Sequence, residues 1–218
     1  MNPRYQIVII NDFLYVNGGA GQVALSSAAE LAKRNHQVIV FGAVGPVGAE
    51  LVHKNIRVIC TDQRDILTDP KRIRAGFQGI WNIKAAELFG RLLDTLDRSD
   101  TIIHIHTWTK ALSSSVVRVA VRKGFKIVCT MHDYFLACPN GGFFNYPKNK
   151  ICHLSPLSLQ CIFENCDMRC YSNKLWRIFR HVIQKWLGLM PSGITYFIAV
   201  SPLSMDILQP FLPKGSTV

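Results

Sequence analysis

The sequence predicts an α/β domain built on a Rossmann-like, doubly wound parallel sheet. Six short runs rich in β-branched residues alternate with segments of helical periodicity, which is typical of a parallel sheet covered on both faces. Right-handed crossovers make the doubly wound arrangement the natural way to connect such elements. With 218 residues, of which 49% are hydrophobic, the chain can form a substantial core. We therefore predict that residues 1–218 form one domain.

The predicted strands are apolar runs with little alternation of polarity, as expected for strands buried on both faces of a sheet. They comprise residues 5–10, 36–42, 56–60, 100–106, 125–130 and 195–201. Apolar periodicity predicts helices between them, over residues 22–35, 46–54, 80–96, 110–123 and 174–189, with a last short helix after the sixth strand. Residues 61–79 are polar and favour neither structure. Residues 132–172 break the α/β alternation and form a predicted Cys-rich insertion.

A glycine motif lies between the first strand and the first helix. The stretch VNGGAGQ contains Gly19-x-Gly21-x-x-Ala24, which matches a dinucleotide-binding pattern. In such sites the first glycine follows the strand almost at once, and an acidic residue near the end of the second strand holds the ribose. Here residues 11–17 intervene and the second strand ends without an acid, so NAD and FAD are not expected. Glycines at a helix N-terminus predict instead an anion-facing loop, and a turn without a ligand is the alternative.

Histidines follow the fourth and fifth predicted strands. His104, His106 and Trp108 belong to the first group, and His132 and Asp133 to the second. Because ligands of open α/β sheets bind beyond the carboxyl ends of the strands, these side chains are expected at the same edge as the glycines. His106 and Trp108 are predicted to contact the ligand, and His132 and Asp133 are the predicted catalytic residues. An imidazole beside a carboxylate can orient a hydroxyl group or carry a proton. Burial of the histidines as partners of backbone groups is the alternative.

Five of the seven cysteines lie between residues 138 and 170. Since the apparent compartment is reducing, a disulfide framework is not expected. A structural zinc site is one hypothesis, and buried free thiols or disulfides formed during purification are the others. The predicted zinc ligands are Cys152, Cys161, Cys166 and Cys170.

The chain is strongly basic, with a formal net charge of +11. Such a charge suits a polyanionic partner, namely nucleic acid, an anionic membrane surface or a phosphorylated substrate. The basic residues are scattered and no nucleic-acid motif is present, so nucleic acid is not favoured. Residues 174–189 form a basic, Trp-containing helix that suits a membrane interface, with an ordinary packed helix as the alternative. Without a signal peptide or a long apolar stretch, we expect a cytoplasmic protein, peripheral at the inner face of the cell membrane.

Four stretches together resemble the N-terminal half of a family 4 retaining glycosyltransferase with the two-domain GT-B fold. They are NGGAGQVALSSAAELAKRNHQV, IIHIHTW, VCTMHDYFLACPNGG and YFIAVSPLSMDIL, which run through most of the chain in this order. The HDY…CP stretch and the later cysteines resemble family members that act on cell-surface polysaccharides.

The resemblance implies an acceptor-binding domain of a hexosyltransferase that uses a nucleotide-diphosphate sugar and a glycan or lipid-linked acceptor. It implies that Gly18, Gly19 and Gly21 lie near the donor diphosphate and the acceptor. It gives His132 a place near the transferred sugar and His106 a place in the acceptor cleft. The family's C-terminal donor domain carries an E-x7-E motif that this sequence lacks, so the chain alone is expected to be inactive. The alternative from another class is a zinc-stabilised, non-catalytic module that binds nucleic acid or another polyanion.

Overall fold

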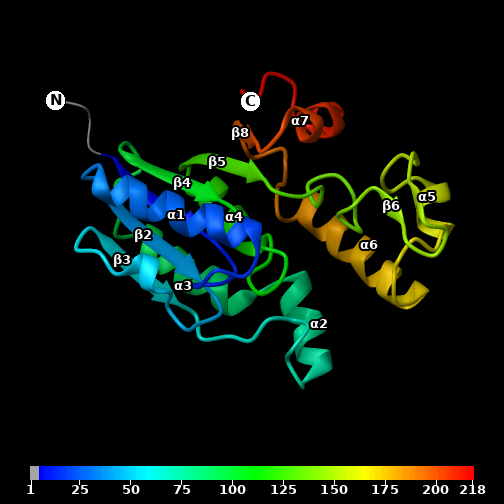
Figure 1. Ribbon diagram of the computed structural model, residues 1–218, viewed down its shortest axis with the longest axis horizontal. Coiled ribbons are helices and arrows are strands. Elements are labelled where there is room, and N and C mark those ends of the chain that lie inside the picture. Colours follow the sequence, from blue (N-terminus) through cyan, green and yellow to red (C-terminus); the bar gives the residue numbers. More distant parts are fainter. Residues whose placement is uncertain (1–4) are drawn as a thin grey trace.

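The computed structural model describes residues 5–218 and contains a six-stranded parallel sheet with the strand order β3-β2-β1-β4-β5-β8 (Figure 1). Every neighbouring pair in this sheet is parallel. The order runs outward from β1 in both directions, which is the doubly wound arrangement that the sequence predicts. The strands are β1 (Gln6–Ile10), β2 (Gln37–Gly42), β3 (Ile56–Cys60), β4 (Thr101–Ile105), β5 (Lys126–Met131) and β8 (Tyr196–Ala199).

The core consists of two layers, one on each face of the sheet. In β1, Val8 and Ile10 pack in the layer that contains Phe89, whereas Ile7 and Ile9 pack in the layer that contains Leu25. Successive side chains of a strand point to opposite faces, so a strand with both faces covered has to be apolar throughout. This is why these runs show no polar alternation.

The helices around the sheet agree with the prediction except near residues 61–114 and over 46–54, where the predicted helix is only a 3-10 turn. They are α1 (Gly19–Lys33), α2 (Arg72–Ile80), α3 (Ile83–Leu93), α4 (Ser115–Arg122) and α7 (Pro202–Leu208), with short 3-10 turns η1 (Ala49–Leu51) and η2 (Gln209–Phe211). The helix predicted over 80–96 is confirmed as α3, with later and tighter bounds. Asn82 sets its start, because the Asn82 side chain accepts a hydrogen bond from the backbone N–H of Ala85 and so caps α3.

The segment between β5 and β8, which includes the predicted insertion over residues 132–172, extends beyond the carboxyl ends of the strands beside α2 (Figure 1). It contains a two-stranded antiparallel ladder of β6 (Phe144–Asn145) and β7 (Lys150–Ile151), the short helix α5 (Leu159–Phe163) and the long helix α6 (Tyr171–Trp186). Among residues 5–218, no helix combines the length and the apolar character that a bilayer crossing requires.

Helix α6 buries a mainly polar face and exposes an apolar one, which is the reverse of an ordinary amphipathic helix. Its buried residues are mainly polar, namely Lys174, Ile178, Arg180, His181 and Gln184. In contrast, Leu175, Phe179 and Trp186 are exposed and recur at spacings that place them on one helix face. The alternative of a packed helix with a solvated charged face therefore holds only for the exposed Lys185, because Lys174 and Arg180 are buried among specific partners described below.

Candidate functional site

The site lies at the edge where β1, β4 and β5 end. These three strands are adjacent and parallel, so the segments that follow them meet beyond one edge of the sheet. The segment after β1 leads to the glycines at the start of α1, and the segments after β4 and β5 begin with His106 and His132. The glycines and the histidines that the sequence singled out thus follow strands that end at the same edge of the sheet.

Two histidines form the polar centre of this edge. The Nδ1 atom of His106 lies 3.0 Å from Nε2 of His132, so one neutral ring donates to the other. His106 is 2% exposed and its Nε2 atom has no partner among the described residues. Burial, reinforced by the neighbouring His104 and His132, lowers the pKa of His106 to about 2. Burial also lowers the pKa of His132. Both rings are neutral at pH 7, and the partly exposed His132 is the one that a ligand can reach.

The remaining predicted residues of the two histidine segments have different surroundings. Nε2 of His104 lies 2.8 Å from the hydroxyl of Thr130. Asp133 is exposed and accepts a hydrogen bond from the backbone N–H of Phe135 at 3.0 Å. Within the described chain no hydrogen bond joins Asp133 to His132, so His106 and not Asp133 orients the His132 ring. A catalytic role for Asp133 stays a prediction.

Trp108 departs from the expectation that it contacts a ligand. Its side chain is 4% exposed, and its indole N–H donates to Oε1 of Gln184 at 3.0 Å. The amide of Gln184 in turn donates to the carbonyl oxygen of Phe135 at 2.8 Å. Trp108 therefore has a packing role, because it connects the segment after β4 to helix α6.

The glycine loop leaves backbone donors free. Gly18 has a φ of 88°, a conformation that glycine adopts without steric cost, and a Cβ atom at Gly18 or Gly19 would meet nothing within 4 Å. The first helical bond of α1 runs from Gln22 to Gly18, and no side chain caps the helix. The preceding N–H groups, including that of Gly19, are thus available to an anion. Gly21 is buried against the backbone of Tyr15.

Asp12 is a residue of this edge that the sequence analysis missed. Its side chain is fully buried and accepts three backbone hydrogen bonds, from Lys110, Ala111 and Leu112, at 2.8–2.9 Å. Burial raises the pKa of Asp12, and the three N–H donors oppose that effect. Asp12 thus fixes the segment after β4, and it explains why α4 begins only at Ser115. The sequence did contain a signal for this role, because Asp12 is an acidic residue two positions after the end of a buried strand.

Replacement of Asp12 by alanine is expected to lower the free energy of unfolding by about 2–3 kcal/mol, because buried N–H donors lose their acceptor. Urea denaturation followed by circular dichroism measures this change. The matched control is Asp206→Ala, which alters an exposed aspartate on α7. An equal effect of the two substitutions would contradict the role of Asp12.

The predicted zinc site is not formed. The ammonium group of the buried Lys174 lies 3.0 Å from Sγ of Cys166 and 3.6 Å from Sγ of Cys161, where a positive charge opposes a metal cation. Cys170 is exposed and its Sγ lies 3.1 Å from the hydroxyl of Ser172. Across residues 5–218, no group of three or more His, Cys, Asp or Glu side chains is arranged to hold a metal ion. The predicted set of zinc ligands is therefore wrong, and the structure has free thiols at Cys152, Cys161, Cys166 and Cys170.

Cys170 is expected to be the thiol that reacts fastest. Its hydrogen bond with Ser172 lowers the pKa of the exposed thiol, whereas burial raises the pKa of Cys152, and the thiolate is the reactive form. Stopped-flow reaction with a chromogenic disulfide should show a fast phase that Cys170→Ser removes and Cys152→Ser keeps. A fast phase that survives Cys170→Ser would contradict this assignment.

The parallel sheet, with a glycine-initiated helix and polar side chains at one edge, defines the class of the domain as the N-terminal Rossmann-like domain of the GT-B type. The sequence matches the model of Glycosyltransferase Family 4 over residues 17–214. The chain therefore belongs to glycosyltransferase family 4.

Solved structures similar to this chain share its fold at low sequence identity. A UDP-glucosyltransferase from Polygonum tinctorium, capable of glucosylating indoxyl, matches with a TM-score of 0.50 and 13% identity, covering 100% of this chain and 51% of that one. Phytolacca americana apo UGT2 gives a TM-score of 0.49 and 12% identity, covering 98% and 50%. The present chain thus spans about half the length of these structures. A comparison with curated protein sequences finds no match.

Proposed function

We propose that this chain is the acceptor-binding half of a retaining hexosyltransferase. The complete enzyme moves a sugar from a nucleotide-diphosphate donor to a cell-surface polysaccharide or a lipid-linked glycan. The observation that carries the proposal is that the His106–His132 pair and the free N–H groups of the glycine loop follow strands that end at one sheet edge, in a chain of glycosyltransferase family 4. The UDP-glucosyltransferase from Polygonum tinctorium makes a uridine diphosphate sugar the first donor to test.

Each group has a defined task in such a transfer. Negative charge grows on the diphosphate as its bond to the sugar breaks, and N–H donors at the start of α1 can stabilise that charge. The neutral ring of His132, held by His106 at 3.0 Å, can hydrogen-bond a hydroxyl group of the transferred sugar. Asp133, whose pKa is raised by burial of its carboxyl group, follows His132 at the same edge and is the candidate to contact the acceptor hydroxyl. The C-terminal half of the complete enzyme would bind the rest of the donor.

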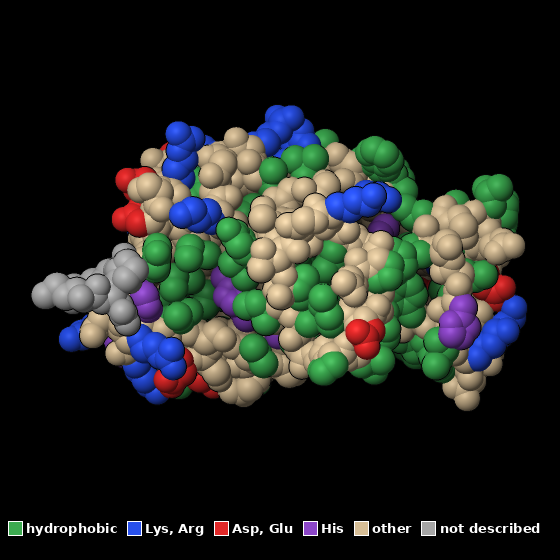
Figure 2. Space-filling view, turned by 90° about the horizontal axis from the view of Figure 1, so that it is seen from above, with side chains coloured by type: hydrophobic (Ala, Val, Ile, Leu, Met, Phe, Trp, Pro, Cys, Tyr) green, Lys and Arg blue, Asp and Glu red, His purple; other side chains and the backbone are tan. Residues whose placement is uncertain are grey.

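Two surface features bear on the alternatives. On the face in Figure 2, lysine and arginine side chains are separated by hydrophobic and polar surface, so this face offers no continuous basic track for a nucleic-acid backbone. The exposed Leu175, Phe179 and Trp186 of α6 instead support peripheral association with a membrane surface, where lipid-linked acceptors are found.

A transfer assay tests the proposal. The longest form of the protein that its gene encodes is incubated with UDP-, GDP- and ADP-sugars and a lipid-linked or polysaccharide acceptor fraction, and release of the nucleoside diphosphate is measured. Acceptor-dependent release with one donor is expected, and NMR of the product should show the anomeric configuration of the donor. An inverted product would refute the retaining mechanism. No release with any donor and either acceptor fraction would refute the transferase assignment.

A further inference from the structure

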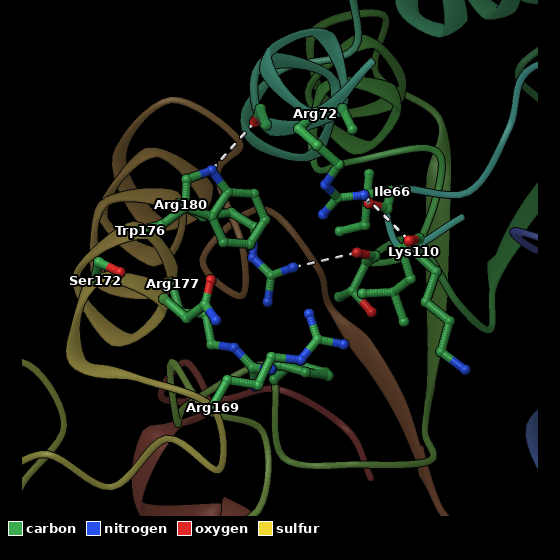
Figure 3. Close-up of a pocket in the computed structure, with 14 residues that line it drawn as sticks. Ile66, Arg72, Lys110, Arg169, Ser172, Trp176, Arg177 and Arg180 are labelled. Carbon is green, nitrogen blue, oxygen red and sulfur yellow. Dashed lines mark hydrogen bonds between the residues drawn. The ribbon is translucent and has the colours of Figure 1, made fainter. Parts of the chain in front are cut away.

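A cavity of about 360 Å³ lies between α2, α6 and the segments that follow β4 and β5 (Figure 3). We call it the arginine pocket. Five of the side chains that line it are cationic, and none of the lining residues is Asp or Glu. The five are Arg72, Lys110, Arg169, Arg177 and Arg180.

Arg180 is the buried member of this group. It is 8% exposed, and its guanidinium donates to the carbonyl oxygen of Thr109 at 3.1 Å. The group also lies 5.0 Å from the ring centroids of both Phe135 and Trp176. Burial, together with the nearby Arg177, lowers the pKa of Arg180 to about 10, so it stays charged at neutral pH. The carboxylates of Asp133 and Asp12 are close enough to oppose this lowering of the pKa. Along residues 5–218, however, no carboxylate lies within ion-pair distance of Arg180, so a bound anion would add a direct partner for this buried charge.

The other arginines are positioned in different ways. Arg177 is neutralised, because its guanidinium lies 3.0 Å from a carboxylate oxygen of Asp167 and donates to Oδ1 of Asn140 at 2.6 Å. Arg72 donates to the carbonyl oxygen of Ile66 at 2.8 Å, which fixes the group without cancelling its charge. Figure 3 shows Arg72 and Arg180 reaching the cavity from two helices and Arg169 from the opposite side, whereas the ammonium group of Lys110 points away from the centre.

We propose that the arginine pocket binds a phosphate or diphosphate group carried by the acceptor. The proposal rests on the acceptor-binding role proposed above. Arg72, Arg169 and Arg180 have no carboxylate partner in the part of the chain that the structure describes, and planar guanidinium groups match the geometry of phosphate oxygens. Several positive charges favour a multiply charged anion over a single carboxylate.

The position of the pocket assigns the anion to the acceptor. Thr109 and Phe135 line the cavity and lie three residues after His106 and His132, so the pocket is formed by the same two segments as the proposed transfer site. Apolar side chains, including Ile66, Ala75 and the indole of Trp176, form another part of the wall. They suit the sugar or lipid portion that is attached to the phosphate.

Calorimetric titration of the protein with pyrophosphate, inorganic phosphate, glucuronate and UDP tests this proposal. Pyrophosphate is expected to bind more tightly than phosphate and glucuronate, and its affinity should fall as salt is added. Arg180→Gln and Arg169→Gln should each weaken pyrophosphate binding at least about tenfold. The matched control is Arg122→Gln, an exposed arginine at the C-terminal end of α4, at the opposite edge of the sheet. Arg169 is exposed, so its variant reports on binding even if Arg180→Gln fails to fold.

Several results would overturn the proposal. Equal losses in the Arg169 and Arg122 variants would show that pyrophosphate binds by general charge. Tighter binding of glucuronate would assign the pocket to a carboxylate, and tight UDP binding that depends on Arg169 would assign it to the donor. Absence of pyrophosphate binding would remove the site altogether. Arg169-dependent pyrophosphate binding in a protein that transfers no sugar would refute the proposed function while leaving the anion site established.

Discussion

Replacement of His132 by alanine is expected to lower the rate constant of sugar transfer about 1,000-fold, the upper range for loss of a preorganised hydrogen-bond donor or acid–base group. The reason is that His106 holds the His132 ring in one orientation at 3.0 Å, so no other side chain can take its place against the sugar. The substitution removes a partly exposed ring and should leave the protein folded. Steady-state kinetics with the active donor measures kcat and KM, and the loss is expected in kcat.

The matched control is His153→Ala, which removes an exposed histidine of the insertion and should leave kcat unchanged. Thermal melts of both variants separate a loss of chemistry from a loss of fold. If His132→Ala transferred sugar at the original rate, the histidine pair would have no part in the reaction.

Acidification from pH 7 to pH 5 is expected to lower the free energy of unfolding by several kcal/mol. Burial lowers the pKa of His104 to about 4 and of His106 to about 2, from an ordinary value of 6.5. Burial, with help from Arg180 and Lys185, lowers the pKa of His181 to about 4. Between pH 6.5 and pH 4 the unfolded chain therefore binds more protons than the folded chain. The free energy of unfolding consequently decreases as the pH is lowered. Each of the three histidines contributes about 2 kcal/mol over this step.

Urea denaturation at pH 7.5, 6 and 5 gives the slope of stability against pH. His181→Gln should reduce that slope by about one proton, because it removes one buried titrating group. His153→Gln, at an exposed histidine, should leave the slope as it is. A flat profile between pH 7 and pH 5, or an unchanged slope in His181→Gln, would show that these histidines become protonated without loss of the fold.

The fold was predictable because each strand is a local apolar run and because parallel crossovers have one handedness. Tyr5 to Ile10 and the five other runs fall within one or two residues of the observed strands. The convergence of His106, His132 and the glycines at one edge follows from the same topology. Apolar periodicity did not predict the helix within residues 61–79, where α2 begins at Arg72. Tertiary contacts hold this helix in place, and one of them is the hydrogen bond from the indole N–H of Trp176 to the carbonyl oxygen of Gly76.

Residues held by distant partners were not predictable from their neighbours in sequence. Asp12 accepts its hydrogen bonds from residues about a hundred positions away, and Trp108 meets Gln184 across 76 positions. Apolar periodicity also assigns Lys174 and Arg180 to the solvent-facing side of α6. The periodicity contains no information about the thiols, carbonyl oxygen and aromatic rings that these two side chains contact in the fold. The cysteine spacing misled for the same reason, because it does not reveal an ammonium group between two sulfur atoms.

Gln184 uses one amide to connect the indole of Trp108 with the carbonyl oxygen of Phe135. Helix α6 is thereby joined to both segments that line the arginine pocket. If the arginine pocket binds the acceptor as proposed, residues 106–112 and 132–187 form one block that has to be exchanged together between relatives to change acceptor preference. A chimera that takes the insertion without the segment after β4 would separate this amide from one of its two partners. A chimera is expected to adopt the acceptor preference of the donor of these segments only when both segments, 106–112 and 132–187, are exchanged.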